Sequence, residues 1–375
     1  MIIIKLAYNF LLLFVVCINL SCLFATNGDS STVGTNVLKS SQFNGMWLWG
    51  SYMNRTNLTE LKLHGINNII IHEDVFTRNS PDDVYNWINE ANSLDIKIHI
   101  WIQCFYKNGS WVKPVLENGS YNRTRFDEII DKAVNYSKIA NVSGVHLDYL
   151  RYPGTAYRAT GGYMNACNAI SSLVSELKSN ITSINSDIML SAAVMPELEN
   201  DTVYYNQTIP FGTYADAYYY GQNISALGTY LDYLIPMIYK GNYMSKDFYK
   251  KYDSWIGATT SKFVQLSPKA KIISGLQGYV SDDDPTPLPP QELAGDVDIA
   301  LSNGAYGFCI FRFGLFNYID NLNNNTNNSS TYYSNSVEDD FVLNENSDNI
   351  ISYRTGFPLL FLLLLLVCGF YSWKR

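Results

Sequence analysis

Between residues 43 and 313, apolar strand-like runs alternate with helix-like segments, and few folds can accommodate that alternation. Runs such as 69–71 and 96–102 consist mainly of apolar residues. Strands of this kind occur in parallel sheets whose two faces are both covered. The pattern therefore predicts an α/β protein built on a parallel sheet.

Periodicity places the individual elements. Strands are expected at 43–50, 68–74, 96–105, 144–150, 187–195, 233–239, 271–278 and 307–313. Helices are expected at 58–64, 82–94, 125–139, 162–184, 224–231, 246–266 and 291–302. Eight strand–helix units in about 250–290 residues predict a single closed (β/α)₈ barrel, which we assign to residues 43–316. An open doubly wound sheet is the rival, but no Gly-x-Gly-x-x-Gly turn follows the first strand.

Composition narrows the class of ligand. The chain is 47% hydrophobic, which excludes disorder as its overall state. Its net charge is -8 and no basic patch stands out, so we expect no nucleic-acid partner. The 29 Tyr, 18 Phe and 7 Trp supply flat apolar faces with polar edges, which suit sugars. Ordinary aromatic packing is the alternative explanation.

Both ends of the chain have the features of targeting segments. Residues 1–25 combine Lys5 with an apolar run and are expected to form a signal peptide, with an uncleaved anchor as the alternative. Residues 317–354 are rich in Asn and Ser and predict a stalk. Residues 355–373 predict a transmembrane anchor followed by Lys374 and Arg375, with a removable lipid-anchor signal as the rival. We therefore expect a single-pass protein of the cell membrane with its barrel domain extracellular.

Sequons and cysteines bear on the same question. Asn-x-Ser/Thr sequons occur along the barrel and the stalk, as expected for an exterior glycoprotein. Outside the apolar ends the chain has only Cys104, Cys167 and Cys309, an odd number. Cys104 and Cys309 fall in predicted strands and are expected to be buried free thiols. No Cys-x-x-Cys or His/Cys cluster is present, so we expect neither a metal site nor another cofactor.

The fourth predicted strand carries polar residues where the active site of a barrel lies, at the carboxyl ends of the strands. It reads His146-Leu-Asp148-Tyr-Leu-Arg151-Tyr-Pro153. His146 and Asp148 share one face because strand side chains alternate. We interpret Asp148 as a nucleophile or base at the barrel mouth, with His146 below it as a hydrogen-bond partner. A structural ion pair between Asp148 and Arg151 is the alternative.

This segment resembles the fourth-strand motif, Asp-Tyr-x-Arg-Tyr/Phe-Pro, of glycoside hydrolase-like TIM-barrel families. Two further segments are similar: residues 236–239 resemble the Pro-Met-x-Tyr of the sixth strand, and 98–101 resemble the aromatic end of the third. The resemblance covers about residues 43–314. It implies a TIM barrel with a sugar-cleaving site, and it carries over onto Asp148 and Arg151. It does not identify the acid.

Glycoside hydrolysis usually needs a second carboxyl group. Glu197, at the exit of the fifth predicted strand, is our first choice for the acid, because strands four and five should be adjacent. A capping or surface role is the alternative for Glu197. Glu73, after the second strand, is the second choice. The Asp282–Asp284 run is expected to be a solvated loop.

Substrate-binding candidates are the aromatic, amide and charged side chains near strand ends. Aromatic faces can stack on sugars, and Gln or Arg side chains can hydrogen-bond hydroxyls or a carboxylate. Packing is the alternative for each aromatic residue, and Arg312 could hold an acidic sugar or neutralise Asp148. The candidates are His146, Arg151, Tyr239, Trp49, Trp101, Gln103, Gln277, Arg312 and Glu73.

These observations favour a cell-surface glycoside hydrolase that cleaves a cell-wall, capsule or extracellular polysaccharide by carboxylate acid/base catalysis. The alternative is a glycan-binding adhesin on a degenerate barrel, because no strong motif marks the second carboxyl group. A metal-dependent deacetylase is a weaker third hypothesis, because the histidines His64, His72, His99 and His146 are scattered.

Overall fold

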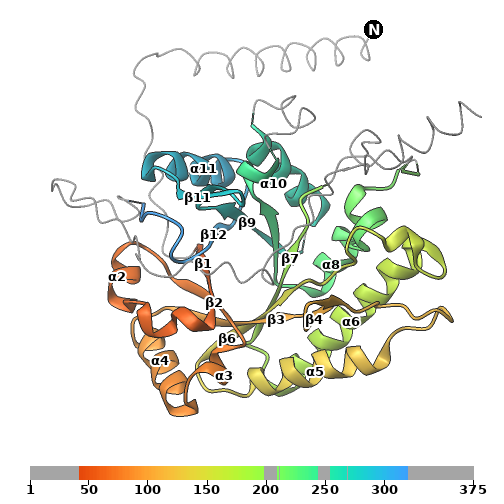
Figure 1. Ribbon diagram of the computed structural model, residues 1–375, viewed down its shortest axis with the longest axis horizontal. Helices are drawn as coiled ribbons and strands as arrows, with labels where there is room; N and C mark the ends of the chain where they lie inside the picture. Colours follow the sequence, from red (N-terminus) through yellow and green to blue (C-terminus); the bar gives the residue numbers. More distant parts are fainter. Residues whose placement is uncertain (1–41, 198–208, 211, 244–253, 268, 320–375) are drawn as a thin grey trace, which may run out of the picture. The chain divides into compact units, whose positions relative to one another are not determined.

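The structure is a computed structural model, and it describes residues 42–197, 209–210, 212–243, 254–267 and 269–319. Eight strands form a closed barrel in the order β1-β12-β9-β8-β7-β6-β3-β2 (Figure 1). All neighbouring strands pair in parallel. The strands are β1 (Phe43–Leu48), β2 (Asn68–His72), β3 (Lys97–Gln103), β6 (Val142–Asp148), β7 (Met189–Val194), β8 (Tyr233–Ile238), β9 (Lys271–Gln277) and β12 (Gly307–Phe311). The predicted (β/α)₈ barrel is confirmed.

Helices surround this barrel. They are α2 (Leu58–Leu63), α3 (Val75–Arg78), α4 (Pro81–Ser93), α5 (Arg123–Ser137), α6 (Gly162–Ile184), α8 (Ile224–Tyr230), α9 (Lys240–Tyr243), α10 (Trp255–Leu266) and α11 (Pro290–Ser302). Short helical turns are η1 (Gly50–Arg55), η2 (Ala156–Arg158) and η3 (Asp216–Tyr220). The helix predicted for 246–266 is described from Trp255, and residues 244–253 lie outside the described part.

Local sequence explains where the helices begin. Ser80 accepts a hydrogen bond from the Asp83 backbone N–H at the start of α4, and Pro81 occupies the first helical position. Asn122 caps α5 in the same way through the Arg125 N–H. Such caps satisfy backbone donors that have no partner inside the helix.

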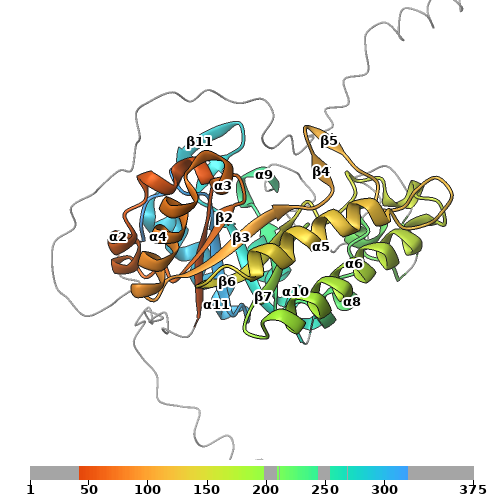
Figure 2. The same cartoon turned by 90° about the horizontal axis from the view of Figure 1, so that it is seen from below.

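Two hairpins lie beyond the carboxyl ends of the barrel strands. Strand β3 leads into β4 (Tyr106–Lys107) and β5 (Ser110–Trp111), and the pair is labelled in Figure 2. Strand β9 leads into β10 (Tyr279–Ser281) and β11 (Asp284–Pro287). The periodicity of the sequence does not predict either hairpin, because their strands are too short to show a pattern.

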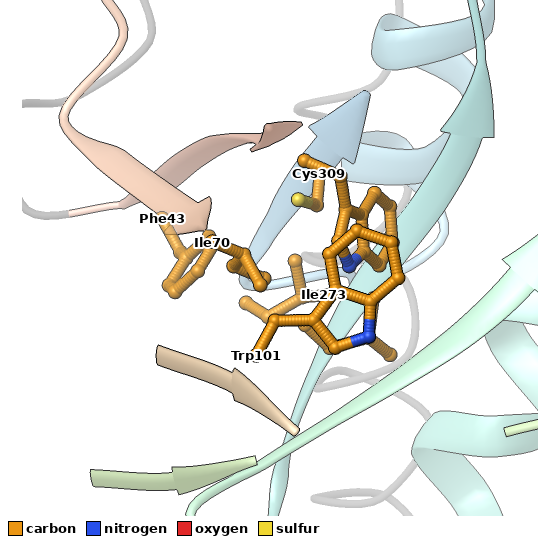
Figure 3. Packing of buried hydrophobic residues seen from close by; sticks show 7 residues of the cluster. Phe43, Ile70, Trp101, Ile273 and Cys309 are labelled. Atoms are coloured by element: carbon orange, nitrogen blue, oxygen red, sulfur yellow. The ribbon is translucent and has the colours of Figure 1, made fainter. Parts of the chain in front are cut away.

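Large side chains fill the barrel interior (Figure 3). The central cluster consists of Phe43, Trp47, Ile70, Trp101, Ile235, Ile273 and Cys309. Glycines make room for it: a Cβ atom at Gly144 would lie 2.2 Å from His99 Nδ1, and one at Gly275 would lie 3.1 Å from Trp47 Cη2. The interior is therefore packed solid, and a ligand is confined to the barrel mouth.

The described residues test some expectations about the rest of the chain. Cys104, Cys167 and Cys309 are buried free thiols, as predicted for the first and last of them. No helix in the described ranges is long and apolar enough to cross a membrane. The predicted signal peptide (1–25), the transmembrane anchor (355–373) and all but the first three residues of the stalk (317–354) lie outside the described residues and remain predictions.

Candidate active site

A pocket opens at the carboxyl ends of the barrel strands. The space free of protein atoms in this pocket and its open mouth is about 530 Å³. Its lining consists of Trp47, Trp101, Asp148, Tyr149, Arg151, Ala193, Met237, Tyr239, Asp282 and Phe311. These residues come from six barrel strands, from the loops after β6 and β8, and from the β10–β11 hairpin that follows β9. The pocket therefore occupies the place that the sequence predicts for an active site.

A second, larger cavity of about 930 Å³ lies on the outside of the barrel. Residues of α6, of α8 and of the segment before α8 form its walls. None of the described residues that line it has a carboxyl or imidazole group. We assign the active site to the first pocket because acid/base chemistry needs such groups.

Asp148 is the last residue of β6, and two N–H groups hold its carboxylate. The Trp101 indole Nε1 donates to Oδ2 at 3.1 Å, and the backbone N–H of Tyr149 donates to Oδ1 at 2.6 Å. Tyr149 has a φ of 48°, a left-handed conformation that is uncommon for a bulky residue. The two donors stabilise the ionised carboxylate and fix its direction.

His146 lies below Asp148 and is fully buried. Its Nδ1 is 2.9 Å from Ser191 Oγ, and its Nε2 accepts from the Trp47 indole Nε1 at 3.3 Å. Burial, with the nearby His99, lowers the pKa of His146 to about 3, so the ring is neutral. Both ring nitrogens are thus engaged, and neither is left to bind Asp148. His146 supports the pocket through Trp47 rather than by lining it.

Arg151 lines the pocket and is only 8% exposed. Its guanidinium carbon lies 4.8 Å from the ring centre of Trp111, with two tyrosine rings also close. Among the described residues no ion pair joins it to Asp148. The alternative of a structural Asp148–Arg151 ion pair is therefore not what this structure contains.

The aromatic candidates occupy different depths. Tyr239 stacks on Phe311 with ring centres 5.3 Å apart, and both line the pocket. Trp49 packs against Trp101, with their ring centres 4.6 Å apart, but does not itself line the pocket. Arg312 lies against Trp49, with its guanidinium carbon 6.0 Å from the ring centre, and it does not line the pocket either.

Glu73 is held away from the pocket. Its carboxylate forms an ion pair with Lys132 at 2.7 Å and accepts from the Tyr136 hydroxyl at 3.0 Å. Both partners belong to α5, so Glu73 ties the end of β2 to that helix. This geometry does not support Glu73 as the acid or as a substrate ligand.

The two glutamines have no place in the pocket lining either. Gln277 is buried and accepts from the Gly241 backbone N–H at 2.9 Å, while its Nε2 donates to Asn242 Oδ1 at 3.2 Å. It therefore fixes the short helix α9 after β8. Gln103 ends β3 directly opposite Asp148 in the barrel register.

Glu197 is buried just beyond β7, next to a second carboxyl group. Its Oε1 accepts from the Tyr243 hydroxyl at 3.1 Å, and its backbone oxygen accepts from the Asp216 N–H at 3.0 Å. Burial, followed by the charge of Glu197, raises the pKa of Asp216 well above its usual value. The pair lies beside the strand next to Asp148, but neither residue lines the pocket.

Sequence reasoning missed two carboxyl groups. Asp282 lies in an exposed loop, as predicted, yet it also lines the pocket, where Tyr279 Oη and Asn242 Nδ2 each donate to it at 2.8 Å. The Asp run after the seventh strand was the available signal, but only the β10–β11 hairpin turns Asp282 inward. Asp216 is in the π-helical turn η3, and no strand-end pattern marks it. No group of three or more potential metal ligands occurs among the described residues.

No family model and no curated protein sequence matches the chain. Solved structures with a similar fold include an endo-β-1,4-mannanase from Thermotoga petrophila, at 14% identity over 73% of this chain and 68% of that one, with a TM-score of 0.49. The spore cortex-lytic enzyme SleL of Bacillus megaterium matches at 14% identity over 75% and 73%, with a TM-score of 0.48. An endo-1,4-β-mannanase from Rhizomucor miehei matches at 13% over 72% and 86%, with a TM-score of 0.49.

Proposed function

We propose that this protein is a glycoside hydrolase whose active site is the pocket around Asp148. The observation that carries the proposal is a carboxylate held by two N–H donors at the mouth of a (β/α)₈ barrel, within aromatic walls. Tyr149, Tyr239 and Phe311 offer flat faces that suit the C–H face of a sugar ring. In this role Asp148 attacks the anomeric carbon or activates water.

The second carboxyl group has two candidates. Glu197 is buried beside Asp216, and its charge helps to raise the pKa of Asp216. Two carboxyl groups that share a buried site favour one shared proton between them, and such a pair can serve as a proton donor. Asp282 lines the pocket itself and faces the substrate without any rearrangement. Glu197 remains our first choice for the acid because of its environment, and Asp282 is the alternative because of its position.

We further propose that the enzyme is held at the cell surface by residues 355–373, with the barrel outside the cell. The apolar ends and the sequons of the sequence support this location. An enzyme so placed acts on a polysaccharide of the cell wall, of a capsule or of the extracellular matrix. An adhesin that binds such a glycan without cleaving it is the second candidate, because Asp148 is the only carboxyl group on a strand end that lines the described pocket.

The test uses the full-length protein with a panel of wall, capsule and matrix polysaccharides, and it follows new reducing ends. Asp148→Asn should lower turnover about a hundredfold or more, the range expected for loss of an acid/base group. Asp127→Asn, an exposed substitution on α5, is the matched control and should leave turnover unchanged. Tight binding of one glycan by both wild type and Asp148→Asn, with no new reducing ends, would establish the adhesin instead.

The same assay identifies the acid. Loss of the acid slows cleavage of poor leaving groups but spares aryl glycosides, whose leaving group needs no protonation. Glu197→Gln should show that pattern and Asp282→Asn should not. The opposite result would assign the acid to Asp282.

A further inference from the structure

Arg151 occupies an aromatic cage on the pocket wall. Its guanidinium carbon is 4.8 Å from the ring centre of Trp111, 5.5 Å from that of Tyr149 and 5.6 Å from that of Tyr220. The faces of aromatic rings attract a cation, but they accept from few or none of its N–H groups. The cage therefore holds the charge in place and leaves its hydrogen-bonding capacity largely unused.

The hydrogen bonds of Arg151 are far from complete. A guanidinium has five N–H donors. Within the described residues it makes one hydrogen bond, from Nη1 to the Tyr152 carbonyl oxygen at 3.2 Å, and its buried Nε has no acceptor. A cation that is 8% exposed needs a compensating anion or acceptor, because burying a charge without one is costly.

The carboxylates of the pocket do not meet that need. Asp148 directs its two oxygens to the Trp101 and Tyr149 N–H groups, and Asp282 is bound by a hydroxyl and an amide. No described acidic residue lies within ion-pair distance of Arg151. The open side of Arg151 is the pocket that it lines.

We infer that the subsite beside Asp148 binds an anionic sugar, a uronic acid or a sulfated residue, whose negative group pairs with Arg151. This inference deepens the proposed function and rests on it, since the subsite belongs to the same pocket. Carboxylates and sulfates both present two oxygens that match the planar fork of a guanidinium, and a lysine cannot reproduce that fork. The substrate class is therefore an acidic polysaccharide.

The test compares matched pairs of substrates on the full-length protein. One pair is a polyuronate and its carboxyl-reduced neutral form, and the other is a sulfated polysaccharide and its desulfated form. Arg151→Gln should raise KM for the charged member of one pair about tenfold or more, as expected for loss of a charge-assisted hydrogen bond. KM for the neutral member should not change, and the pair that responds identifies carboxylate or sulfate.

Two further variants serve as controls for the Arg151→Gln measurement. Arg151→Lys keeps the charge in the cage and should recover part of the lost affinity, which excludes general misfolding. Arg158→Gln removes an exposed arginine that lies over Tyr157, 5.2 Å from its ring centre, outside the pocket. This control should leave KM unchanged for both members of each pair.

If Arg151 acts only on Asp148 and does not bind substrate, the comparison of charged and neutral substrates gives a different result. If Arg151 only balances the charge of Asp148, Arg151→Gln lowers kcat and moves the pH profile equally for charged and neutral substrates. That outcome overturns the inference and leaves the glycosidase standing.

A binding measurement separates the inference from the proposed function. Quenching of the pocket tryptophans Trp47 and Trp101 reports binding of acidic and neutral oligosaccharides without turnover. Arg151-dependent preference for the acidic oligosaccharide, with no hydrolysis of any glycan, refutes the glycosidase but supports the anionic subsite. Equal binding of both oligosaccharides overturns the subsite, whether or not hydrolysis occurs.

Discussion

Acid should destabilise this barrel through two histidines sealed inside it. His99 and His146 are both buried, and burial lowers the pKa of each from 6.5 to about 3. In the unfolded chain the same side chains bind a proton near pH 6.5. The unfolded state therefore binds protons in this pH range and the folded state does not. The free energy of unfolding falls as the pH drops from about 6.5 towards 3.

The size of the effect follows from these pKa values. Between pH 6.5 and pH 4.5 each histidine should cost about 2 kcal/mol of unfolding free energy, or about 4–5 kcal/mol for the two. Asp216 acts in the opposite direction. Its folded-state pKa is raised above the unfolded value, so the cost of burying its carboxyl group is relieved as the pH falls. The histidine contribution is best isolated by difference.

His146→Gln provides that difference. A glutamine can still accept from Trp47 and donate to Ser191, but it does not titrate. Urea unfolding at pH 7.5, 6.5, 5.5 and 4.5 should show that wild type loses about 2 kcal/mol more than the variant over the lowest two pH units. Asp216 and every other shared group cancel in the comparison. Parallel pH dependences for the two proteins would refute a neutral, buried His146.

Three further substitutions test the active site and the contacts that support it. Trp101→Phe keeps the ring but removes the N–H that Asp148 accepts, so kcat/KM on the cleaved glycan should fall about tenfold to a hundredfold. Trp49→Phe removes an indole N–H that has no acceptor among the described residues, and retained activity there is the control. Glu73→Gln weakens the ion pair with Lys132 and should lower the unfolding free energy by about 1–2 kcal/mol without changing KM. A large rise in KM in Glu73→Gln would return that residue to the substrate site.

Local pattern was sufficient for most of the fold. Each barrel strand falls inside or within two residues of its predicted range: residues 307–313 were expected, for example, and β12 covers Gly307–Phe311. Such strands can be recognised in a sequence because a strand that is buried on both faces is largely apolar along its length. The sequence pattern does not predict the short hairpins β4–β5 and β10–β11, because strands of two to four residues are too short to show a periodic pattern.

Part of the site followed from the same reasoning. The ends of the predicted strands point to Asp148, Arg151, Trp101 and Tyr239, and all four line one pocket in the structure. The convergence of strand ends at one face of a barrel makes that prediction possible. Glu73 sits at a strand end too, but nothing in its own segment reveals that Lys132 reaches it from α5.

The amino-acid order by itself thus determined that the chain closes into a barrel and that Asp148 stands at its mouth. Tertiary structure alone decided what each polar group does there. Trp47 and His146 are 99 positions apart, and only closure of the barrel makes one the donor to the other. Arg151 likewise takes its cage from the β4–β5 hairpin and from η3. Partners of this kind depend on three-dimensional approach between distant segments, which no local periodicity encodes.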